Sequence, residues 1–207
     1  MGTPLSRREI LERCLAFGVV AAALPAPILA AAWDEAERLP PTPVNDLGPF
    51  YKRGAPSSAH LRLAGDAGLP LAVAGALVNT RGEPLLDGRI EIWHADHFGK
   101  YDLEGYHFRS ILTPDEHGAY AFDSVMPGHY PARVAQHVHY LISAPGHKPL
   151  STQLYFATDP AFEGDPDHNY GRDPLVTSRE LIRPVRLVGD PGAVSAAVTF
   201  DLCLEPL

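Results

Sequence analysis

Residues 196–206, AAVTFDLCLEP, alternate in apolar and polar character with the two-residue period of a β-strand. Val198, Phe200, Leu202 and Leu204 fall on one face of such a strand, and small or polar side chains fall on the other. A strand with one apolar face needs a second layer to cover that face. This stretch therefore indicates a β-sheet protein with a packed core.

The chain between residue 70 and this stretch carries the same kind of signal. Six further runs are short, rich in β-branched or aromatic residues, and bounded by Gly, Pro, Asn or Asp. These runs are 71–79, 89–95, 119–125, 137–144, 151–157 and 183–189. Residues 33–60 predict an irregular lead-in, and residues 159–174 predict a long functional or surface loop. We therefore expect an all-β fold, an antiparallel β-sandwich with long irregular loops and little helix, in one domain covering residues 33–207.

The N-terminal segment predicts an export signal. Arg7 and Arg8 precede an apolar run that ends in small residues, and this pattern resembles a twin-arginine signal with cleavage near Ala32. A membrane anchor or an amphipathic helix is the alternative, but the run is short for a membrane span and contains Pro25 and Pro27. We therefore expect an exported protein, periplasmic or extracellular, without stable membrane association after the signal is removed.

Charge and cysteine content argue against a nucleic-acid-binding protein and against a disulfide-stabilised one. The chain has a formal net charge of −8, and residues 1–32 hold three arginines and two glutamates (net +1), which leaves −8 − 1 = −9 for the rest. No basic patch is left, so nucleic acid is not an expected partner. Of the two cysteines, Cys14 lies in the signal and Cys203 remains alone. We expect no internal disulfide, which agrees with folding before export.

Two histidines stand two residues apart in a predicted strand, in HVHY at 137–140. Side chains at positions i and i+2 of a strand leave the same face, so His137 and His139 should point the same way. Two neighbouring imidazoles can bind Zn, Cu, Fe or Ni. A partly exposed strand with two polar residues is the alternative, so the pair alone does not identify a metal.

Two tyrosines precede the histidine pair. Tyr101 follows a turn at the end of a predicted strand, and Tyr130 lies shortly before His137. A phenol, with a pKa of about 10, is a poor ligand unless a strongly charged cation stabilises the phenolate. Zinc sites normally use Cys, His and carboxylate, so two tyrosines favour ferric iron. The alternative is that both are ordinary loop and core-edge aromatics.

Four segments in order resemble the intradiol ring-cleavage dioxygenases. They are PTPVNDLGPFY (41–51), RGEPLLDGRIEIWHADHFGKYD (81–102), MPGHYPARVAQHVHY (126–140) and STQLYF (151–156). Agreement of four motifs in the family's order is more specific than any single motif. The resemblance implies a non-haem enzyme with one Fe(III) per chain. Such an enzyme cleaves a catechol-type substrate with O₂ to a cis,cis-muconate-type diacid.

The resemblance also implies roles for single residues. Tyr101 matches the tyrosine ligand that stays bound, and Tyr130 matches the tyrosine ligand that substrate displaces and that then accepts a proton. His137 and His139 match the two histidine ligands. Gln153 matches a glutamine near the substrate.

The lead-in motif and one departure from the family pattern complete the candidate site. Gly48 and Pro49 are candidates for substrate contacts. The family places an arginine three residues before the first histidine, where this chain has Val134. Arg133 is the nearest catalytic candidate, brought to the site by a one-residue bulge. His94 stands where the family commonly has glutamine and is expected at most to contact a ligand.

Three other interpretations stay open from sequence alone. A non-catalytic, transthyretin-like binding module would hold no iron. A different His-based metalloenzyme would use His137 and His139 with a carboxylate and would tolerate Tyr101→Phe. An intradiol fold that binds iron but turns over poorly is the third, because of Val134. The short segment before the lead-in motif favours a protocatechuate-like branch, without naming the catechol, and the chain is expected to be a homo-oligomer or a self-sufficient monomer.

Overall fold

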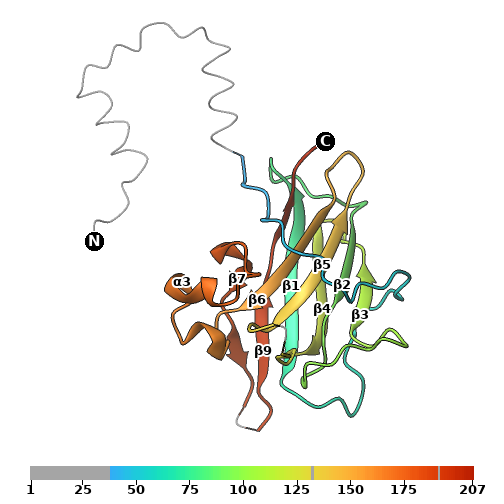
Figure 1. The fold of residues 1–207 in the computed structure, drawn as a ribbon. Coiled ribbons are helices and arrows are strands. Elements are labelled where there is room, and N and C mark those ends of the chain that lie inside the picture. Colours follow the sequence, from blue (N-terminus) through green and yellow to red (C-terminus); the bar gives the residue numbers. More distant parts are fainter. Residues whose placement is uncertain (1–37, 132, 191) are drawn as a thin grey trace, which may run out of the picture. The chain divides into compact units, whose positions relative to one another are not determined.

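The computed structural model describes residues 38–207 with the exception of residues 132 and 191. The predicted export signal, residues 1–32, lies outside the described residues. Residues Leu39–Leu207 form one compact unit, built from two sheets of five strands each, and Figure 1 shows one sheet in front of the other. No helix in the described part of the chain is long and apolar enough to cross a membrane.

The first sheet has the order β3-β2-β5-β6-β7, and the second contains β4, β1, β9, β8 and β10. The strands are β1 (Pro70–Asn79), β2 (Arg89–Trp93), β3 (Arg109–Leu112), β4 (Ala119–Val125), β5 (His137–Ser143), β6 (Leu150–Phe156), β7 (Ile182–Arg183), β8 (Arg186–Val188), β9 (Ser195–Thr199) and β10 (Leu202–Leu204). Between β6 and β7 lie the short helical turns η1 (Pro160–Phe162), α3 (Pro166–Asn169), η2 (Tyr170–Arg172) and η3 (Arg179–Leu181). The predicted all-β sandwich with little helix is confirmed.

The sequence predicted an antiparallel sandwich, and the structure adds that both sheets are mixed. Most neighbouring strands run antiparallel, but β1 pairs in parallel with β9 and β10, and β6 pairs in parallel with β7. Parallel neighbours need a long crossover between them. Residues 157–181 supply that crossover between β6 and β7.

One strand escaped prediction, and two predicted runs are divided. β3 is only four residues long, RSIL, and begins with two polar residues, so its sequence lacks a clear period. The run 183–189 is divided at Pro184 into β7 and β8, which belong to different sheets, because proline has no N–H to donate to a ladder. The run 196–206 is interrupted at Asp201, whose carboxylate accepts the Ala76 N–H at 2.9 Å.

The core lies between the inner faces of the two sheets. Tyr140 of β5 is paired with Ile92 of β2, and both belong to the buried core. The next row of the same sheet is Trp93, His139 and Gln153. Because side chains alternate along a strand, this row lies on the outer face of the first sheet. The histidine pair is therefore on the side away from the sandwich core.

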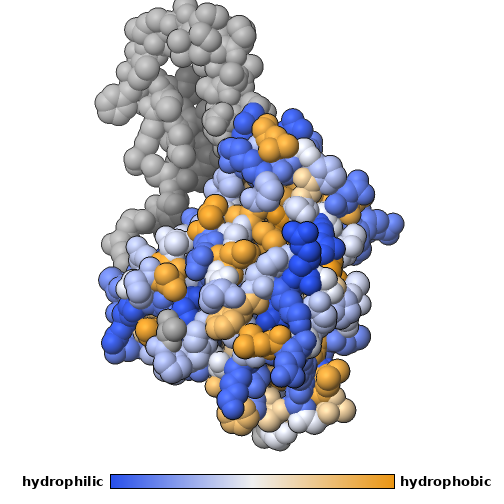
Figure 2. Space-filling model, turned by 45° about the vertical axis from the view of Figure 1, so that its right-hand side comes forward, coloured by the Kyte–Doolittle hydropathy of each residue, from blue (hydrophilic) through white to orange (hydrophobic). Residues whose placement is uncertain are grey.

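This outer face is buried as well, because the lead-in segment (residues 41–51) covers it. The Asn45 N–H donates to the Ser151 carbonyl at 2.8 Å, and the Gln153 amide donates to the Asp46 carbonyl at 2.6 Å. Both faces of β5 are consequently buried along most of its length. On the face shown in Figure 2, by contrast, hydrophobic and hydrophilic residues are interspersed, as is usual for a protein surface.

Candidate metal and substrate site

The two histidines of β5 lie side by side under this cover. His137 and His139 are 2% and 1% exposed, and Trp93 stacks on the His139 ring at a centroid distance of 5.0 Å. His137 Nδ1 lies 2.8 Å from the Ala135 carbonyl, which can only accept, so Nδ1 carries the proton and Nε2 presents a lone pair. Burial lowers the pKa of His137 to about 3, and it lowers the pKa of His139 well below its ordinary value. Both rings are therefore neutral near pH 7 and able to bind a metal ion.

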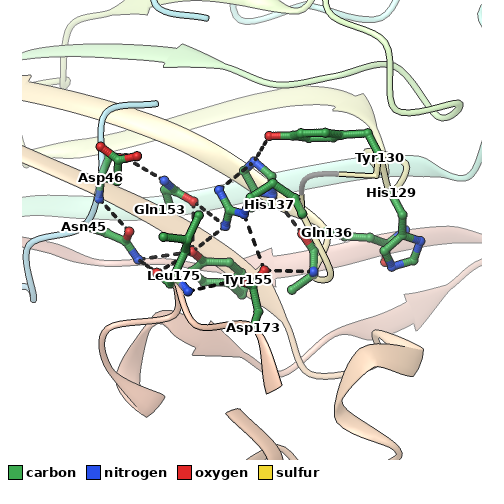
Figure 3. A network of polar contacts seen from close by, with 12 residues as sticks. Asn45, Asp46, His129, Tyr130, Gln136, His137, Gln153, Tyr155, Asp173 and Leu175 are labelled. Atoms are coloured by element: carbon green, nitrogen blue, oxygen red, sulfur yellow. Dashed lines mark hydrogen bonds and ion pairs between the residues drawn. The ribbon is translucent and has the colours of Figure 1, made fainter. Parts of the chain in front are cut away.

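Both tyrosines predicted as ligands meet the histidine pair. Tyr101 Oη lies 3.1 Å from His139 Nε2 and 3.3 Å from His137 Nε2. Tyr130 Oη lies 3.5 Å from His137 Nε2, and Figure 3 shows this tyrosine reaching toward His137. Ligand atoms bound at roughly 2 Å to one cation lie roughly 3 Å from each other. The structure thus brings the four residues together at the spacing of a single metal site, while their role as ligands stays a prediction.

The chemistry of the donors distinguishes between metals. Among the described residues, no group of three or more His, Cys, Asp or Glu side chains is placed to hold a metal ion. The histidine Nε2 atoms instead face phenols and the Arg133 guanidinium. Burial raises the pKa of Tyr101 and of Tyr130, so a phenolate forms here only beside a strongly charged cation. This donor set fits ferric iron better than zinc.

A tight turn after β2 delivers Tyr101. The Asp96 carboxylate accepts the N–H groups of Phe98 and Lys100, each at 2.9 Å, which is the usual way an aspartate closes a turn. The Phe50 ring of the lead-in segment then stacks on Tyr101 with centroids 4.2 Å apart. The turn residues lie within five positions of Tyr101, whereas Phe50 lies about fifty positions before it.

Arg133 reaches the site, and Val134 does not. Arg133 is 6% exposed and Val134 is 49% exposed. The Arg133 Nη1 atom lies 3.3 Å from His137 Nε2. Its Nη2 atom donates to Gln153 Oε1 at 3.0 Å and to the Tyr155 hydroxyl at 2.8 Å. Two of the three catalytic candidates from the sequence, Arg133 and Gln153, are therefore in one hydrogen-bonded network beside the histidine pair, and the third, Tyr130, contacts His137.

A turn and a distant carboxylate hold Arg133 in place. Its backbone N–H donates to the Tyr130 carbonyl at 2.8 Å, so a tight turn brings it to the site and not the strand bulge that we expected. Asp173 Oδ2 lies 3.4 Å from Arg133 Nε and accepts the Ala135 N–H at 3.0 Å; Figure 3 shows Asp173 beneath this network. The two charged side chains are 5% and 2% exposed. Asp173 lies in the loop that the sequence marked as functional or surface, but no local pattern separated it from the other aspartates there.

The lead-in glycine lies directly against a histidine. Gly48 has φ +72°, and a Cβ added there would lie 2.8 Å from His139 Cε1. That separation is too short for a side-chain contact, so the segment approaches the imidazole this closely because the residue is glycine. Pro49 is exposed. Substrate contacts of Gly48 and Pro49 stay a prediction.

Replacing Gly48 with alanine is expected to disturb His139 as well as the backbone. Gly146 provides the control, because it has φ +73° and open space around an added Cβ. Gly146→Ala should cost about 1–2 kcal/mol of unfolding free energy from backbone strain alone. Gly48→Ala should cost more and should lower the metal content per chain, since Trp93 restricts movement of the His139 ring. Urea denaturation and metal analysis measure the two effects, and equal stability losses with unchanged metal content would contradict this expectation.

His94 belongs to the protein interior and not to the ligand set. Its Nε2 atom lies 2.7 Å from Ser124 Oγ, and its Nδ1 atom lies 2.7 Å from the Ala95 carbonyl. Burial lowers the pKa of His94 to about 4, so it is neutral near pH 7. Both ring nitrogens are satisfied by these neighbours, which leaves none for a metal ion.

Comparison with known proteins agrees with this fold. Residues 47–206 match the family model described as Dioxygenase. Catechol 1,2-dioxygenase 2 of Acinetobacter lwoffii is 33% identical over 148 residues, which cover 58% of this chain and 52% of that protein. Hydroxyquinol 1,2-dioxygenase of Nocardioides simplex is 32% identical over 189 residues, which cover 77% of this chain and 63% of that protein.

A solved structure extends the comparison to three dimensions. The dioxygenase domain of a dioxygenase and carbohydrate-binding protein fusion from Streptomyces sp. SirexAA-E is similar with a TM-score of 0.68 and 31% identity. The match covers 81% of this chain and 100% of that domain. The fold and the converging phenols and imidazoles define a β-sandwich protein with a candidate metal site. The chain belongs to the dioxygenase family, the intradiol ring-cleavage dioxygenases, and it spans about half the length of the Acinetobacter lwoffii relative.

Proposed function

We propose that this chain is a non-haem iron(III) intradiol dioxygenase, which cleaves a catechol-type ring with O₂ to a cis,cis-muconate-type diacid. The observation that carries the proposal is the convergence of two phenol oxygens and two imidazole Nε2 atoms at separations of 3.1 to 3.5 Å. Membership of the intradiol family supports the same activity. One Fe(III) per chain, held by Tyr101, Tyr130, His137 and His139, is the proposed cofactor.

The donor chemistry supports iron as the metal. The imidazoles are neutral, and the phenols ionise here only against a strong positive charge. When bound, ferric iron would supply a Lewis acid that draws electron density from the catechol and makes its ring reactive toward O₂. The chain's own residues supply orientation, charge and proton transfer around that site.

The two tyrosines are not equivalent. Tyr101 Oη contacts both histidines, and its ring is held by Phe50. Tyr130 Oη contacts His137 at the longer distance of 3.5 Å. Tyr130 can therefore move away with less disturbance, and we assign its Oη atom as the acceptor of a proton from a catechol hydroxyl.

Arg133 supplies a fixed positive charge beside His137. Gln153, Tyr155 and Asp173 occupy its other donors, so the guanidinium cannot swing away. A preorganised cation stabilises negative charge that develops on the substrate ring without reorganising during the reaction. Arg133 thus supplies the positive charge that Val134 cannot. This favours an active enzyme over the alternative of an iron-binding protein with little activity.

The visible absorption spectrum of the iron-loaded protein tests the proposal. We expect a broad tyrosinate-to-iron band that moves to longer wavelength when a substrate binds without oxygen. Catechol, chlorocatechol and hydroxyquinol, for which relatives are named, and protocatechuate form the panel. The same compounds supplied with O₂ should yield a muconate-type product. A colourless protein that contains iron, or one that takes up no iron, would contradict the proposed ligand set.

We also propose that residues 1–32 direct export to the periplasm or the exterior by the twin-arginine route. The support is the Arg7–Arg8 pair ahead of an apolar run. Replacing both arginines with lysine should retain the full-length chain in the cytoplasm of a bacterial host, as measured by cell fractionation. Export at the original level in the double variant would contradict the route.

A further inference from the structure

Arg109 is a buried cation whose hydrogen bonds all go to carbonyl oxygens. It is 4% exposed and is paired with Trp93 across the β2–β3 ladder, so it lies on the same outer face as His139. Its Nη1 atom donates to the Phe50 carbonyl at 2.6 Å. Its Nε and Nη2 atoms both donate to the Asp102 carbonyl, at 3.3 and 3.1 Å. Within the described part of the chain, no carboxylate forms an ion pair with it.

Burying the Arg109 guanidinium costs free energy, so the contacts that it makes there are expected to have a structural role. Burial lowers the pKa of Arg109, because a cation loses hydration and neutral carbonyls return only part of that free energy. The guanidinium fork nonetheless spans two chain segments with three N–H groups. A lysine ammonium is a point donor and could not reach both carbonyls in this way.

The two carbonyls belong to segments that meet at Tyr101. Asp102 directly follows Tyr101, and the Phe50 ring stacks on Tyr101 with an angle of 21° between the planes. Phe50 also meets the Tyr130 ring edge-on at 6.1 Å. Arg109 therefore connects the sheet, the loop that carries Tyr101 and the ring that packs over Tyr101.

We propose that Arg109 is a positioning residue for the site. By holding the Phe50 and Asp102 carbonyls to β3, it fixes the Tyr101 hydroxyl beside the histidine pair and keeps the Phe50 ring against Tyr101. The effect of Arg109 on catalysis rests on the function proposed above. The hydrogen bonds by which Arg109 links the two segments are present in the chain without metal.

A second link between the same segments provides a matched control. Lys52 donates to the Glu104 and Gly105 carbonyls at 2.6 and 3.0 Å. It joins the residue directly after the lead-in segment to the far end of the loop, where its bond to Glu104 is exposed. Lys52→Met removes that link and leaves the contacts at Phe50 and Asp102 in place.

Hydrogen exchange of the metal-free, full-length protein tests the link directly. In Arg109→Lys and Arg109→Gln we expect amides in residues 46–54 and 100–107 to exchange roughly tenfold faster, since neither side chain can keep the guanidinium hydrogen bonds to both carbonyls. Lys52→Met should leave the amides next to Phe50 and Tyr101 near their original rates. Unchanged exchange in the Arg109 variants, or faster exchange in one segment alone, would overturn the proposal.

The iron-loaded variants test positioning as distinct from stability. At equal iron content, Arg109→Lys should shift the tyrosinate band and raise the KM for the preferred catechol, and Lys52→Met should do neither. Phe50→Leu, which keeps Arg109, should shift the band in the same direction and covers the case in which Arg109 variants fold poorly. A band that stays in place in a fully loaded Arg109→Lys protein overturns the inference. Absence of a tyrosinate band in the unaltered protein defeats the proposed function, and hydrogen exchange still decides the role of Arg109.

Discussion

Replacing Tyr101 with phenylalanine is expected to remove most of the tyrosinate-to-iron absorption and to lower ring cleavage by at least ~10²-fold. Loss of a group that only supports a metal ligand already costs roughly 10- to 100-fold, and Tyr101 is proposed as a ligand itself. Its hydroxyl is the phenol oxygen that contacts both His137 and His139. The phenylalanine ring can keep the stack on Phe50, so the fold should be retained.

Tyr106→Phe is the matched control for this change. Tyr106 lies on the same loop, and its hydroxyl donates to the Arg53 carbonyl at 3.0 Å near the surface. It should keep the absorption band and the turnover of the unaltered protein. Absorption spectra, iron analysis and oxygen uptake distinguish the variants. If Tyr101→Phe were as active as Tyr106→Phe, the site would not be a phenolate-ligated ferric centre, and a metalloenzyme that uses the histidines alone would become the better interpretation.

Replacing Arg133 with alanine is expected to destabilise the protein by about 3–5 kcal/mol, because it leaves the Asp173 carboxylate buried without its partner. The Arg133 and Asp173 side chains are 5% and 2% exposed. Activity should fall as well, since the guanidinium also contacts His137 and Gln153. Urea denaturation gives the unfolding free energy, and oxygen uptake gives the activity.

The neighbouring residue provides the control. Val134 is 49% exposed, so Val134→Ala should change the unfolding free energy by less than about 0.5 kcal/mol and leave activity intact. The double variant Arg133→Met with Asp173→Asn removes both charges and should recover much of the stability without recovering activity. A large loss of stability and activity in Val134→Ala, with little effect of Arg133→Ala, would contradict this expectation. Arg133 would then not replace the arginine that the family places at position 134.

Local sequence predicted much of the fold. Five of the seven predicted runs correspond to single strands, from β1 to β6 without β3, because period-two patterns depend on neighbouring residues alone. The same rule placed His137 and His139 on one face of β5 correctly. The Asp96 turn before Tyr101 was also visible, since its hydrogen bonds span at most four residues.

Tertiary structure decided which face of the sheet became the site. Alternation along β5 separates the histidines from Tyr140, but it does not say that the lead-in segment covers the outer face and buries them. The parallel pairing of β6 with β7 depends on how a long crossover packs. No period in the sequence records that path.

The sequence by itself determined most of the strands along the chain, the shared direction of the histidine pair and the four residues that were expected to meet it. Only the tertiary structure decided that Arg133 and not Val134 faces the site, that Asp173 holds it, and that Arg109 joins the Phe50 and Asp102 carbonyls. The physical reason is distance along the chain. Direction within a strand follows from backbone geometry over two residues, whereas Arg133 meets Asp173 across 40 residues and Arg109 meets Phe50 across 59 residues, through the path of the loops.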